Sequence, residues 1–576
     1  MALLTQLIVR GVLRRMNNND GYGVVYTPST LSDYVARLLI NEYRNSNKSK
    51  NSSDCLTILD PACGEGALLS ACDQACTFCN NKHFVGIDVD KCVINGNKKY
   101  YNAKQYTFIA QDTLLPGIGE NSEHYWKSQG IEPDLIIANP PWSSEKIYDR
   151  AQLSDAGFKL DVGQYDSYVL FIELCLKLLK PNGYAAFIIP DSIFASENKE
   201  LRKYLSENTE LKVISRLGEK IFQGVNRATT VIIVKKSIPN ETAGTTCFRL
   251  TTKQRKSYLA GETSLMDIHE QYAHVVYQKR FRSNSGYIFD IDTRRTEEAL
   301  LDKMASDSIQ WNKIFHFGRG VEVSKSGTIV MCPYCKMAQG FSKRQLQDGH
   351  KNCVKCGGQI IVTNETMETI IGPQPHEGYK KIYVGENLHR YSIRGACYIK
   401  MGVPGINYKE EKLYEPPKML IRKTGLGINA CIDYESTYIS QTVYSCNYLN
   451  PDNKIPLEYF LGVLNSRVLY YFYLKKYGEN EWKSHPYFTK EIIFSLPIPS
   501  VTPENSNICT EISQSVKQLQ REYSRDIDLQ IERMVAMLYK LTHEEFLLVA
   551  AEINRLPDLG AINHMKMNKE EICLDI

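Results

Sequence analysis

The chain has 576 residues, of which 43% are hydrophobic and 23% charged, and its formal net charge is +4. These values are typical of a globular protein with two or three domains and exclude a disordered chain. The net charge is too small to indicate a polyanionic partner, so any nucleic-acid-binding surface must be local. We expect no membrane span, and 17 cysteines without a secretory leader predict a cytoplasmic protein with reduced or metal-bound thiols.

The first predicted elements are a helix, a strand and a glycine-rich turn. Tyr26-Thr27-Pro28 precedes residues 31–39, where the spacing of the apolar residues predicts a helix. Apolar residues 56–59 then predict a strand, which Asp60-Pro-Ala62-Cys-Gly64-Glu-Gly66 follows directly. Glycines in such a turn allow the backbone to approach a bound molecule closely.

The next two predicted strands each end in an acidic residue. Val85-Gly-Ile-Asp88 places a carboxylate where it can accept hydrogen bonds from ribose hydroxyls. The strand at residues 106–110 leads into Gln111-Asp112, where an acid or amide could face an adenine amino group. Asp112 could instead cap the turn that follows it.

Further strands predict a nucleoside-binding sheet. Residues 134–138, 184–189 and 229–234 alternate with helical segments. This alternation predicts a doubly wound, parallel α/β sheet with its binding edge at the carboxyl ends of the strands.

At that edge the fourth strand ends in Asn139-Pro140-Pro141-Trp142. The prolines prevent the strand from continuing, so Asn139 and Trp142 should project from it. The Asn139 side-chain oxygen and the Pro140 carbonyl can both accept hydrogen bonds from an exocyclic amine, and Trp142 can stack on the ring that carries it. Neither acceptor is a nucleophile or a strong base, so the reaction requires a reactive cofactor.

The second half of the chain contains a predicted metal site. Cys332-Pro-Tyr-Cys335 and Cys353-Val-Lys-Cys356 provide two Cys-x2-Cys pairs, whose separation is typical of four-thiolate zinc ribbons. A closed site of this kind is structural, because no coordination position is left for water. We therefore predict structural zinc in a ribbon inserted at residues 328–362.

Two later stretches indicate a binding surface and a helical tail. Aromatic and basic residues alternate between Arg467 and Lys490, which suits either a surface that grips DNA or a helix with a buried aromatic face. We expect a mixture of both. From Glu511 the apolar residues have helical spacing, which predicts a long or broken amphipathic helix.

Taken together, Tyr26-Thr-Pro28, Asp60-Pro-Ala-Cys-Gly64, Val85-Gly-Ile-Asp88, Asp112 and Asn139-Pro-Pro-Trp142 resemble the amino-group DNA methyltransferases of the gamma arrangement, TaqI type. The resemblance covers roughly the first 240 residues. Lys418–Thr424, Leu464-Asn-Ser-Arg467 and Leu496–Pro499 resemble the C-terminal specificity domain of the same family more loosely.

The resemblance implies a set of site residues. It implies S-adenosylmethionine as cofactor and the N6 amine of a flipped adenine as acceptor. Asn139, Pro140, Trp142 and Phe222 would be the catalytic residues, with Phe222 as a second aromatic contact to the base. The cofactor would lie against Tyr26, Thr27, Asp60, Ala62, Gly64, Asp88, Asp112, Asn139 and Pro140. The family more often has tyrosine where this chain has Trp142, and that change preserves stacking.

The resemblance also implies a domain order and partners. We expect a catalytic domain at residues 1–245, a mixed α+β target-recognition domain at 246–505, and a helical region at 506–576. Double-stranded DNA would be the substrate, within a prokaryotic restriction–modification or related system. Few residues precede the cofactor motifs and no nuclease motif is evident, so we expect any endonuclease on a separate chain.

Two alternatives remain open from the sequence. Asn-Pro-Pro-aromatic motifs also serve amino-methylation of RNA or of glutamine in proteins. The fold could also be retained in a DNA-binding protein without catalytic activity, although intact Asn139 and Asp88 argue against this.

Overall fold

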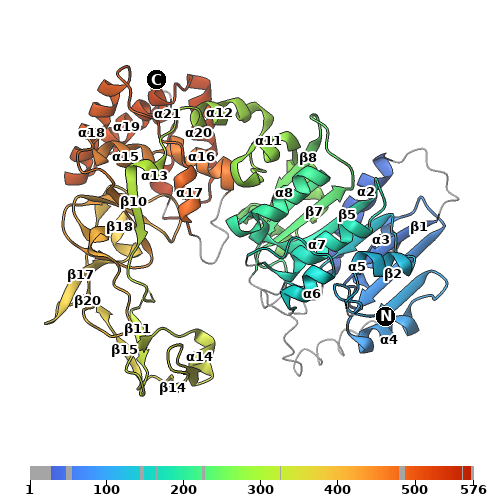
Figure 1. Ribbon diagram of the computed structural model, residues 1–576. Helices are drawn as coiled ribbons and strands as arrows, with labels where there is room; N and C mark the ends of the chain where they lie inside the picture. Colours follow the sequence, from blue (N-terminus) through green and yellow to red (C-terminus); the bar gives the residue numbers. More distant parts are fainter. Residues whose placement is uncertain are drawn as a thin grey trace. The chain divides into compact units, whose positions relative to one another are not determined.

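The computed structural model describes residues 27–46, 55–117, 119–142, 148–163, 165–222, 227–324, 326–478, 487–560 and 562–572 (Figure 1). Tyr26 lies outside the described residues. The chain divides into two compact units, Met1–Arg295 and Thr296–Ile576. None of the described helices is long and apolar enough to cross a membrane.

The first unit extends beyond the domain boundary predicted at residue 245. Strand β8 (Gly244–Arg249) pairs in parallel with β6 (Glu210–Gly218), and β9 (His274–Tyr277) pairs antiparallel with β8. Because these strands continue the first sheet, the compact unit ends at Arg295 instead.

The sheet of the first unit has nine strands in the order β3-β2-β1-β4-β5-β7-β6-β8-β9. Its remaining strands are β1 (Leu56–Asp60), β2 (Lys82–Asp88), β3 (Tyr106–Ala110), β4 (Leu135–Ala138), β5 (Tyr184–Pro190) and β7 (Thr229–Lys235). The five strands from β3 to β5 are parallel. The prediction of an all-parallel sheet is wrong for β7, which is antiparallel to both β5 and β6, because the short connection from β6 returns the chain alongside it.

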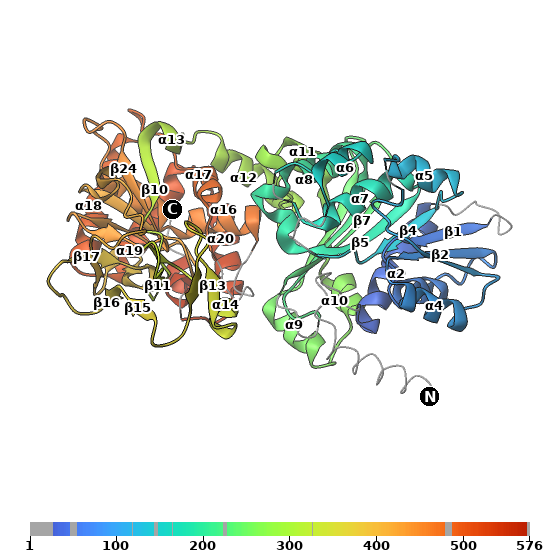
Figure 2. The ribbon, with the colours of Figure 1, turned by 60° about the horizontal axis from the view of Figure 1, so that its bottom comes forward.

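Helices cover both faces of this sheet (Figure 2). The helices are α2 (Ser29–Ser46), α3 (Ala67–Ala75), α4 (Lys91–Tyr100), α5 (Ser122–Ser128), α6 (Arg150–Asp155), α7 (Ser167–Leu178), α8 (Lys199–Asn208), α9 (Thr252–Leu259), α10 (Leu265–Tyr272) and α11 (Gln278–Ser283). Along β5, Ala185, Phe187 and Ile189 pack in the core that contains α5, α7 and α8. Tyr184 and Ile188 face the opposite core, which contains α2, α3 and α10. The sheet is therefore buried on both sides, as in doubly wound folds.

The strand order reverses between β1 and β4, which are neighbours in the sheet although β2 and β3 separate them in the chain. In open α/β sheets, ligands bind outside the carboxyl ends of the strands at such a switch point. Asp60 ends β1 and Asn139 follows β4, so both lie at this position.

The second unit is a helical layer packed on small sheets. Its main sheet has the order β10-β24-β21-β22. The strands of this sheet are β10 (Phe315–Arg319), β21 (Lys418–Arg422), β22 (Ala430–Asp433) and β24 (Val443–Tyr448). The helices are α12 (Glu298–Ala305), α13 (Trp311–Ile314), α15 (Leu457–Leu464), α16 (Arg467–Tyr477), α17 (Lys490–Ser495), α18 (Ser506–Arg521), α19 (Arg525–Leu538), α20 (His543–Arg555) and α21 (Lys569–Ile572). One core joins Met419 and Ile421 of the sheet to α15, α16, α18, α19 and α20, so the helical tail is part of this unit.

Shorter strands form the rest of the second unit. The cysteine ribbon consists of β11 (Thr328–Met331), β12 (Ala338–Gln339), α14 (Lys343–Gln347), β13 (His350–Asn352), β14 (Gln359–Ile361) and β15 (Met367–Thr369). A separate sheet has the order β16-β20-β17-β23, and β18 pairs with β19. These strands are β16 (Ile371–Gly372), β17 (Tyr379–Tyr383), β18 (Leu388–His389), β19 (Ser392–Ile393), β20 (Cys397–Lys400) and β23 (Tyr438–Ile439).

The aromatic stretch after Arg467 faces the core along most of α16. Tyr470, Tyr471, Phe472 and Tyr473 are all at most 5% exposed, so these rings are not available to grip DNA. Of the two predicted alternatives, a helix with a buried aromatic face is the one found for α16. Tyr487 and Lys490 are exposed, and residues 479–486 lie outside the described residues.

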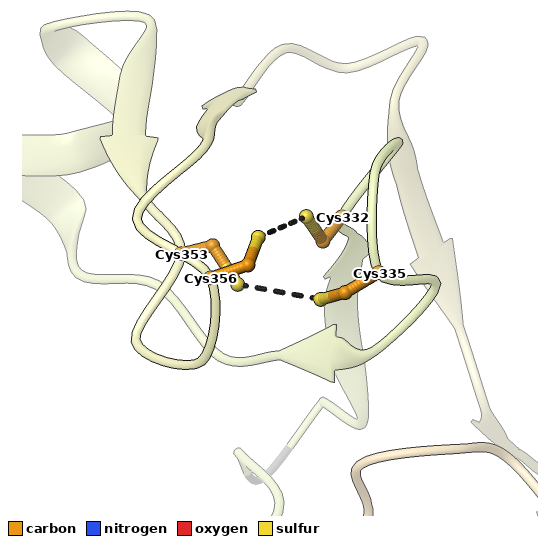
Figure 3. Close-up of side chains that lie close together, drawn as sticks. All are labelled: Cys332, Cys335, Cys353 and Cys356. Carbon is orange, nitrogen blue, oxygen red and sulfur yellow. Dashed lines mark hydrogen bonds between the residues drawn. The ribbon is translucent and has the colours of Figure 1, made fainter.

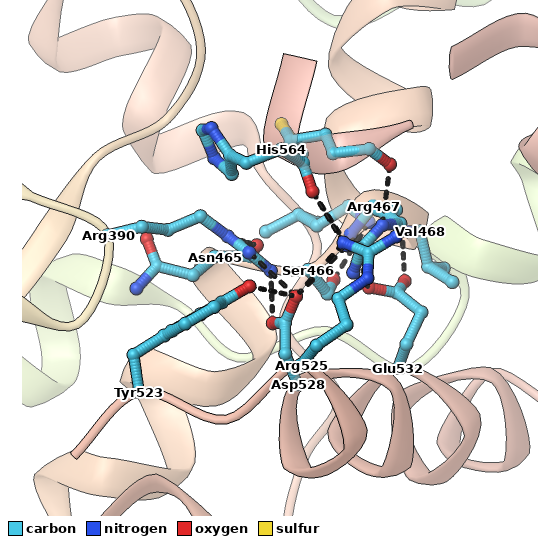
Figure 4. Close-up of polar contacts among 12 residues, drawn as sticks. Arg390, Asn465, Ser466, Arg467, Val468, Tyr523, Arg525, Asp528, Glu532 and His564 are labelled. Carbon is cyan, nitrogen blue, oxygen red and sulfur yellow. Dashed lines mark hydrogen bonds and ion pairs between the residues drawn. The ribbon is translucent and has the colours of Figure 1, made fainter. Parts of the chain in front are cut away.

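A buried ionic network joins the junction of α15 and α16 to α19 (Figure 4). Both oxygens of Asp528 accept hydrogen bonds from the Arg390 guanidinium, at 2.7 and 3.0 Å, and Arg467 donates to Asp528 at 3.0 Å. Glu532 accepts from the Arg467 and Val468 N–H groups, each at 2.8 Å, and so caps the start of α16. Burial alone would raise the pKa of Asp528, but the charges of the two arginines outweigh it and lower that pKa.

We expect Asp528→Ala to destabilise the second unit by about 3–5 kcal/mol, because it leaves two buried guanidinium groups without their shared carboxylate. Urea unfolding followed by circular dichroism measures this. Asp33→Ala, which breaks an exposed pair with Arg37, is the control and should cost less than about 1 kcal/mol. Equal stabilities for the two variants would contradict a structural role for the network.

Candidate functional site

The glycine turn after β1 lies at the carboxyl edge of the sheet and is held from several sides. Gly64 and Gly66 have φ values of +47° and +81°, which favour glycine. A Cβ at Gly66 would lie 2.9 Å from the Tyr101 hydroxyl, whereas the space around Gly64 is open. Asn97 donates to the Gly64 carbonyl at 2.7 Å, so α4 fixes the turn while leaving its open side accessible.

The predicted acids at the strand ends lie beside this turn. Asp88 accepts hydrogen bonds from the Gly64 and Asp90 N–H groups, both at 2.9 Å. Asp112 accepts from the Leu114 N–H at 2.9 Å and from the Tyr148 hydroxyl at 2.9 Å. Asp112 therefore does cap the following turn, and it also borders the cavity described below.

Side chains from three distant segments hold the Asn139–Trp142 turn. The Asn139 amide nitrogen donates to the Thr27 hydroxyl at 3.0 Å, which turns the amide oxygen away from Thr27. Ser167, at the start of α7, donates to the Pro141 carbonyl at 2.6 Å. Arg227 donates to the Trp142 carbonyl. Among the described residues, none donates a hydrogen bond to the Pro140 carbonyl, which leaves this acceptor for a ligand.

Trp142 is half-buried, and its indole N–H donates to the Ile188 carbonyl at 3.3 Å. Phe222 packs edge-to-face against it, with 5.3 Å between ring centroids. Phe222 is 2% exposed. The structure thus brings Phe222 to Trp142, and a direct contact between Phe222 and a base stays a prediction.

A cavity of about 380 Å³ connects these groups, within the range of small-molecule sites. The predicted residues on its wall are Thr27, Asp60, Ala62, Gly64, Asp88, Asp112, Asn139, Pro140 and Trp142. Phe222 does not line it. Sequence reasoning missed Glu65, Leu68, Val89, Tyr148, Ser167 and Phe171, which also line the cavity. Ser167 and Arg227, which hold the Asn139–Trp142 turn, do not belong to a recognisable sequence motif. Only the Asp-Ser pair at the start of a helix could have indicated Ser167.

Asp60 is the buried acid of the site, with 1% of its surface exposed. Burial raises the pKa of Asp60 to about 8, and repulsion from the Asp88 carboxylate adds to this, although a hydrogen bond from the Ala62 N–H acts in the opposite direction. The wall of the cavity therefore contains a carboxyl that is neutral over much of the physiological range and that a cationic ligand would favour in its ionised form.

The four predicted metal-ligand cysteines converge at the tips of two loops in the second unit (Figure 3). The sulfur atoms of Cys332, Cys335, Cys353 and Cys356 all lie within 4.8 Å of one another. Cys332 and Cys356 are 3.6 Å apart, as are Cys335 and Cys353. These distances are far longer than the ~2.05 Å of a disulfide and close to the edge of about 3.8 Å in a tetrahedron with 2.3 Å metal–sulfur bonds.

The fold and the site together define a class. The sheet, the glycine turn after β1, the acid at the end of β2 and the Asn-Pro-Pro-Trp turn after β4 are those of an S-adenosylmethionine-dependent methyltransferase.

Family comparisons agree with this class. The N-6 DNA Methylase family model matches residues 11–292, and the TaqI-like C-terminal specificity domain matches residues 380–498. Residues 11–292 are therefore similar to N-6 DNA methylases, and residues 380–498 are similar to a TaqI-like C-terminal specificity domain.

Individual relatives are similar over shorter stretches. The Type II methyltransferase M.BanIII of Aneurinibacillus aneurinilyticus is 34% identical over 217 residues, which cover 35% of this chain and 36% of that protein. M.VspI of Vibrio sp. (strain 343), also a Type II methyltransferase, is 26% identical over 246 residues, which cover 41% and 53%. This chain thus spans about a third to a half of the length of these relatives.

Among solved structures, the DNA-bound ATP-dependent Type ISP restriction–modification enzyme LlaBIII has a TM-score of 0.50 at 13% identity, covering 88% of this chain and 40% of that one. At 13% identity, this similarity indicates a shared fold and no more.

We expect the stability of the wild type relative to Asp60→Asn to fall as the pH rises from about 4 to about 8. The folded-state pKa of Asp60 lies above its usual 3.8, so in this window the folded protein holds a proton that the unfolded chain has lost. Denaturant titrations of both proteins across this pH range measure the difference. Asp33→Asn, at an exposed carboxyl, is the control. A pH-independent difference in stability between the wild type and Asp60→Asn would show that Asp60 is already ionised in the folded protein.

Proposed function

We propose that the protein is a site-specific DNA methyltransferase that modifies the N6 amine of adenine within a restriction–modification or related system. The observation that supports this most directly is the arrangement of acceptors in the Asn139–Trp142 turn. The Pro141 and Trp142 carbonyls are bonded to Ser167 and Arg227, whereas the Pro140 carbonyl has no donor among the described residues. An exocyclic amine has two hydrogens, and the Asn139 amide oxygen and the Pro140 carbonyl can each accept one.

In this proposal the residues position the amine and do not act as bases. Two acceptors orient the amine and increase the availability of its lone pair. Thr27 holds the Asn139 amide so that its oxygen faces the amine. Trp142 offers an aromatic face to the base ring, and stacking of about 1–3 kcal/mol offsets much of the few kcal/mol that flipping a base out of the duplex costs.

S-adenosylmethionine supplies an electrophilic sulfonium methyl group when it is bound. The cavity wall fits such a cofactor, because it combines an open glycine backbone at Gly64 with acids at two strand ends. Asp88 would accept hydrogen bonds from ribose hydroxyls and Asp112 would face the adenine amino group of the cofactor. Asp60 would gain a cationic neighbour, which favours its ionised form.

The second unit would provide DNA recognition. The match to a TaqI-like specificity domain supports this role, with double-stranded DNA as the partner.

The cysteine ribbon would hold a structural zinc ion. Four cysteine sulfurs within 4.8 Å of one another suit zinc, and a closed site of this kind leaves no position for catalytic water. Gln339 donates to the Cys353 sulfur at 2.7 Å, as residues outside a metal's own ligands often do to fix a ligand. Zinc would stabilise a ribbon whose own core is small, with Val330, Ile360 and Val362 as its buried aliphatic residues.

We expect Asn139→Ala to lower the turnover of methyl transfer by about 100-fold or more while S-adenosylmethionine still binds, because one of the two amine acceptors is lost. Transfer of a tritiated methyl group to DNA, RNA and protein measures activity and identifies the substrate, and calorimetry measures cofactor binding. Asn208→Ala, an exposed asparagine at the end of α8, is the matched control. Near-normal turnover of the Asn139 variant, or transfer only to RNA or protein by the wild type, would overturn the proposal.

We expect the purified protein to contain about one zinc ion per chain and to lose it on Cys353→Ser combined with Cys356→Ser. Mass spectrometry of the metal content and limited proteolysis of the ribbon measure this, since loss of zinc should expose the ribbon to cleavage. Cys55→Ser combined with Cys92→Ser removes two exposed thiols outside the ribbon and is the control. Zinc content that is unaffected by the ribbon substitutions would refute the site.

A further inference from the structure

We propose that Arg227 is a positioning residue that fixes Trp142 for stacking on the substrate base. This role rests on the proposed function and goes beyond it, because Arg227 is not among the residues expected to touch the base or the cofactor. The residue belongs to the connection that leads into β7, far in sequence from the Asn139–Trp142 turn.

The contacts of Arg227 converge on Trp142. One arm of the guanidinium donates to the Trp142 carbonyl, and the other donates to Asp166 at 2.7 Å. The guanidinium carbon lies 5.9 Å from the centroid of the indole ring, within the range of a cation–π interaction. Arg227 therefore restrains both the backbone and the side chain of Trp142.

Through Asp166, the Arg227 contact is connected to the N-terminal end of α7, which also holds Pro141, the residue before Trp142. Asp166 is the N-cap of α7, and the next residue, Ser167, donates to the Pro141 carbonyl at 2.6 Å. The two carbonyls after Pro140 are thus fixed to the start of one helix, the first through a hydroxyl and the second through an Arg–Asp pair. Loss of Arg227 would remove the restraint on the Trp142 backbone, while the indole N–H bond to Ile188 and the Ser167 bond to Pro141 remain.

The position of Arg227 argues for an indirect role. Trp142 lines the cavity, but neither Arg227 nor Asp166 does. A guanidinium offers only hydrogen-bond donors and no acceptor, which suits Arg227 to holding the oxygen atoms of its neighbours. Its planar fork suits two acceptors at once, a carbonyl and a carboxylate, whereas lysine offers a single point charge. A lysine should therefore restore only part of the restraint.

The experiment compares wild type, Arg227→Ala and Arg227→Lys in methyl transfer from S-adenosylmethionine to unmethylated genomic DNA. We expect Arg227→Ala to lower kcat by about 10–100-fold, the effect of misplacing a group by about 1 Å, with KM for the cofactor changed less than about twofold. Arg227→Lys should recover part of the loss, and added guanidinium ion should partly restore Arg227→Ala. Arg37→Ala, which removes an exposed arginine paired with Asp33 at 2.9 Å, is the control and should leave kcat unchanged.

Three results would count against the proposal in different ways. Unchanged kcat in Arg227→Ala would overturn the role of Arg227 and leave the proposed function intact. An equal loss of cofactor affinity and of kcat, without rescue by guanidinium or lysine, would show that Arg227 only supports the fold. A wild-type protein that transfers no methyl group to DNA would overturn the proposed function and this role together.

Discussion

The site depends on the Asn139–Trp142 turn, which is held by side chains from other segments of the chain. Two consecutive prolines remove two backbone N–H donors from Asn139–Trp142, so the turn cannot form the backbone hydrogen bonds that usually fix a loop. Thr27, Ser167 and Arg227 replace them with side-chain groups from before α2, from α7 and from the connection that leads into β7. The Pro140 carbonyl lines the cavity and accepts no hydrogen bond from the described residues, so the turn that depends on its surroundings also offers an acceptor to an amine.

The neighbouring acids add an electrostatic constraint. Asp60 and Asp88 lie close enough for repulsion to contribute to the raised pKa of Asp60, and Asp88 is already bonded to the Gly64 backbone. Such an arrangement is unfavourable in the empty cavity and becomes favourable around a positive charge. Selectivity for a cationic ligand can thus be built into the wall of the cavity before any specific contact is made.

Much of the first unit could be predicted, because its signals are local. Apolar runs ended by Asp60, Asp88 and Asn139 mark buried parallel strands, and nine of the predicted site residues do lie on one cavity. The antiparallel β7 and the roles of Ser167 and Arg227 depend on tertiary pairing that no local pattern records. The aromatic run after Arg467 could be read in two ways, because α16 is apolar around most of its surface and a mixed basic-aromatic composition does not reveal which side is covered.

The junction between α15 and α16 has a consequence for how the second unit can be recombined. The Asn465 side chain donates to the Ala430 carbonyl on β22 and accepts from the Ala430 N–H, both at 3.0 Å. Arg467, two residues later, is buried and donates to Asp528 of α19. Residues 465–467 therefore link the sheet to the helices by hydrogen bonds, in addition to the core that the two layers share. A recombination breakpoint placed between residues 465 and 467 would separate Ala430 of β22 from Asp528 and Glu532 of α19, whose contacts pass through this segment.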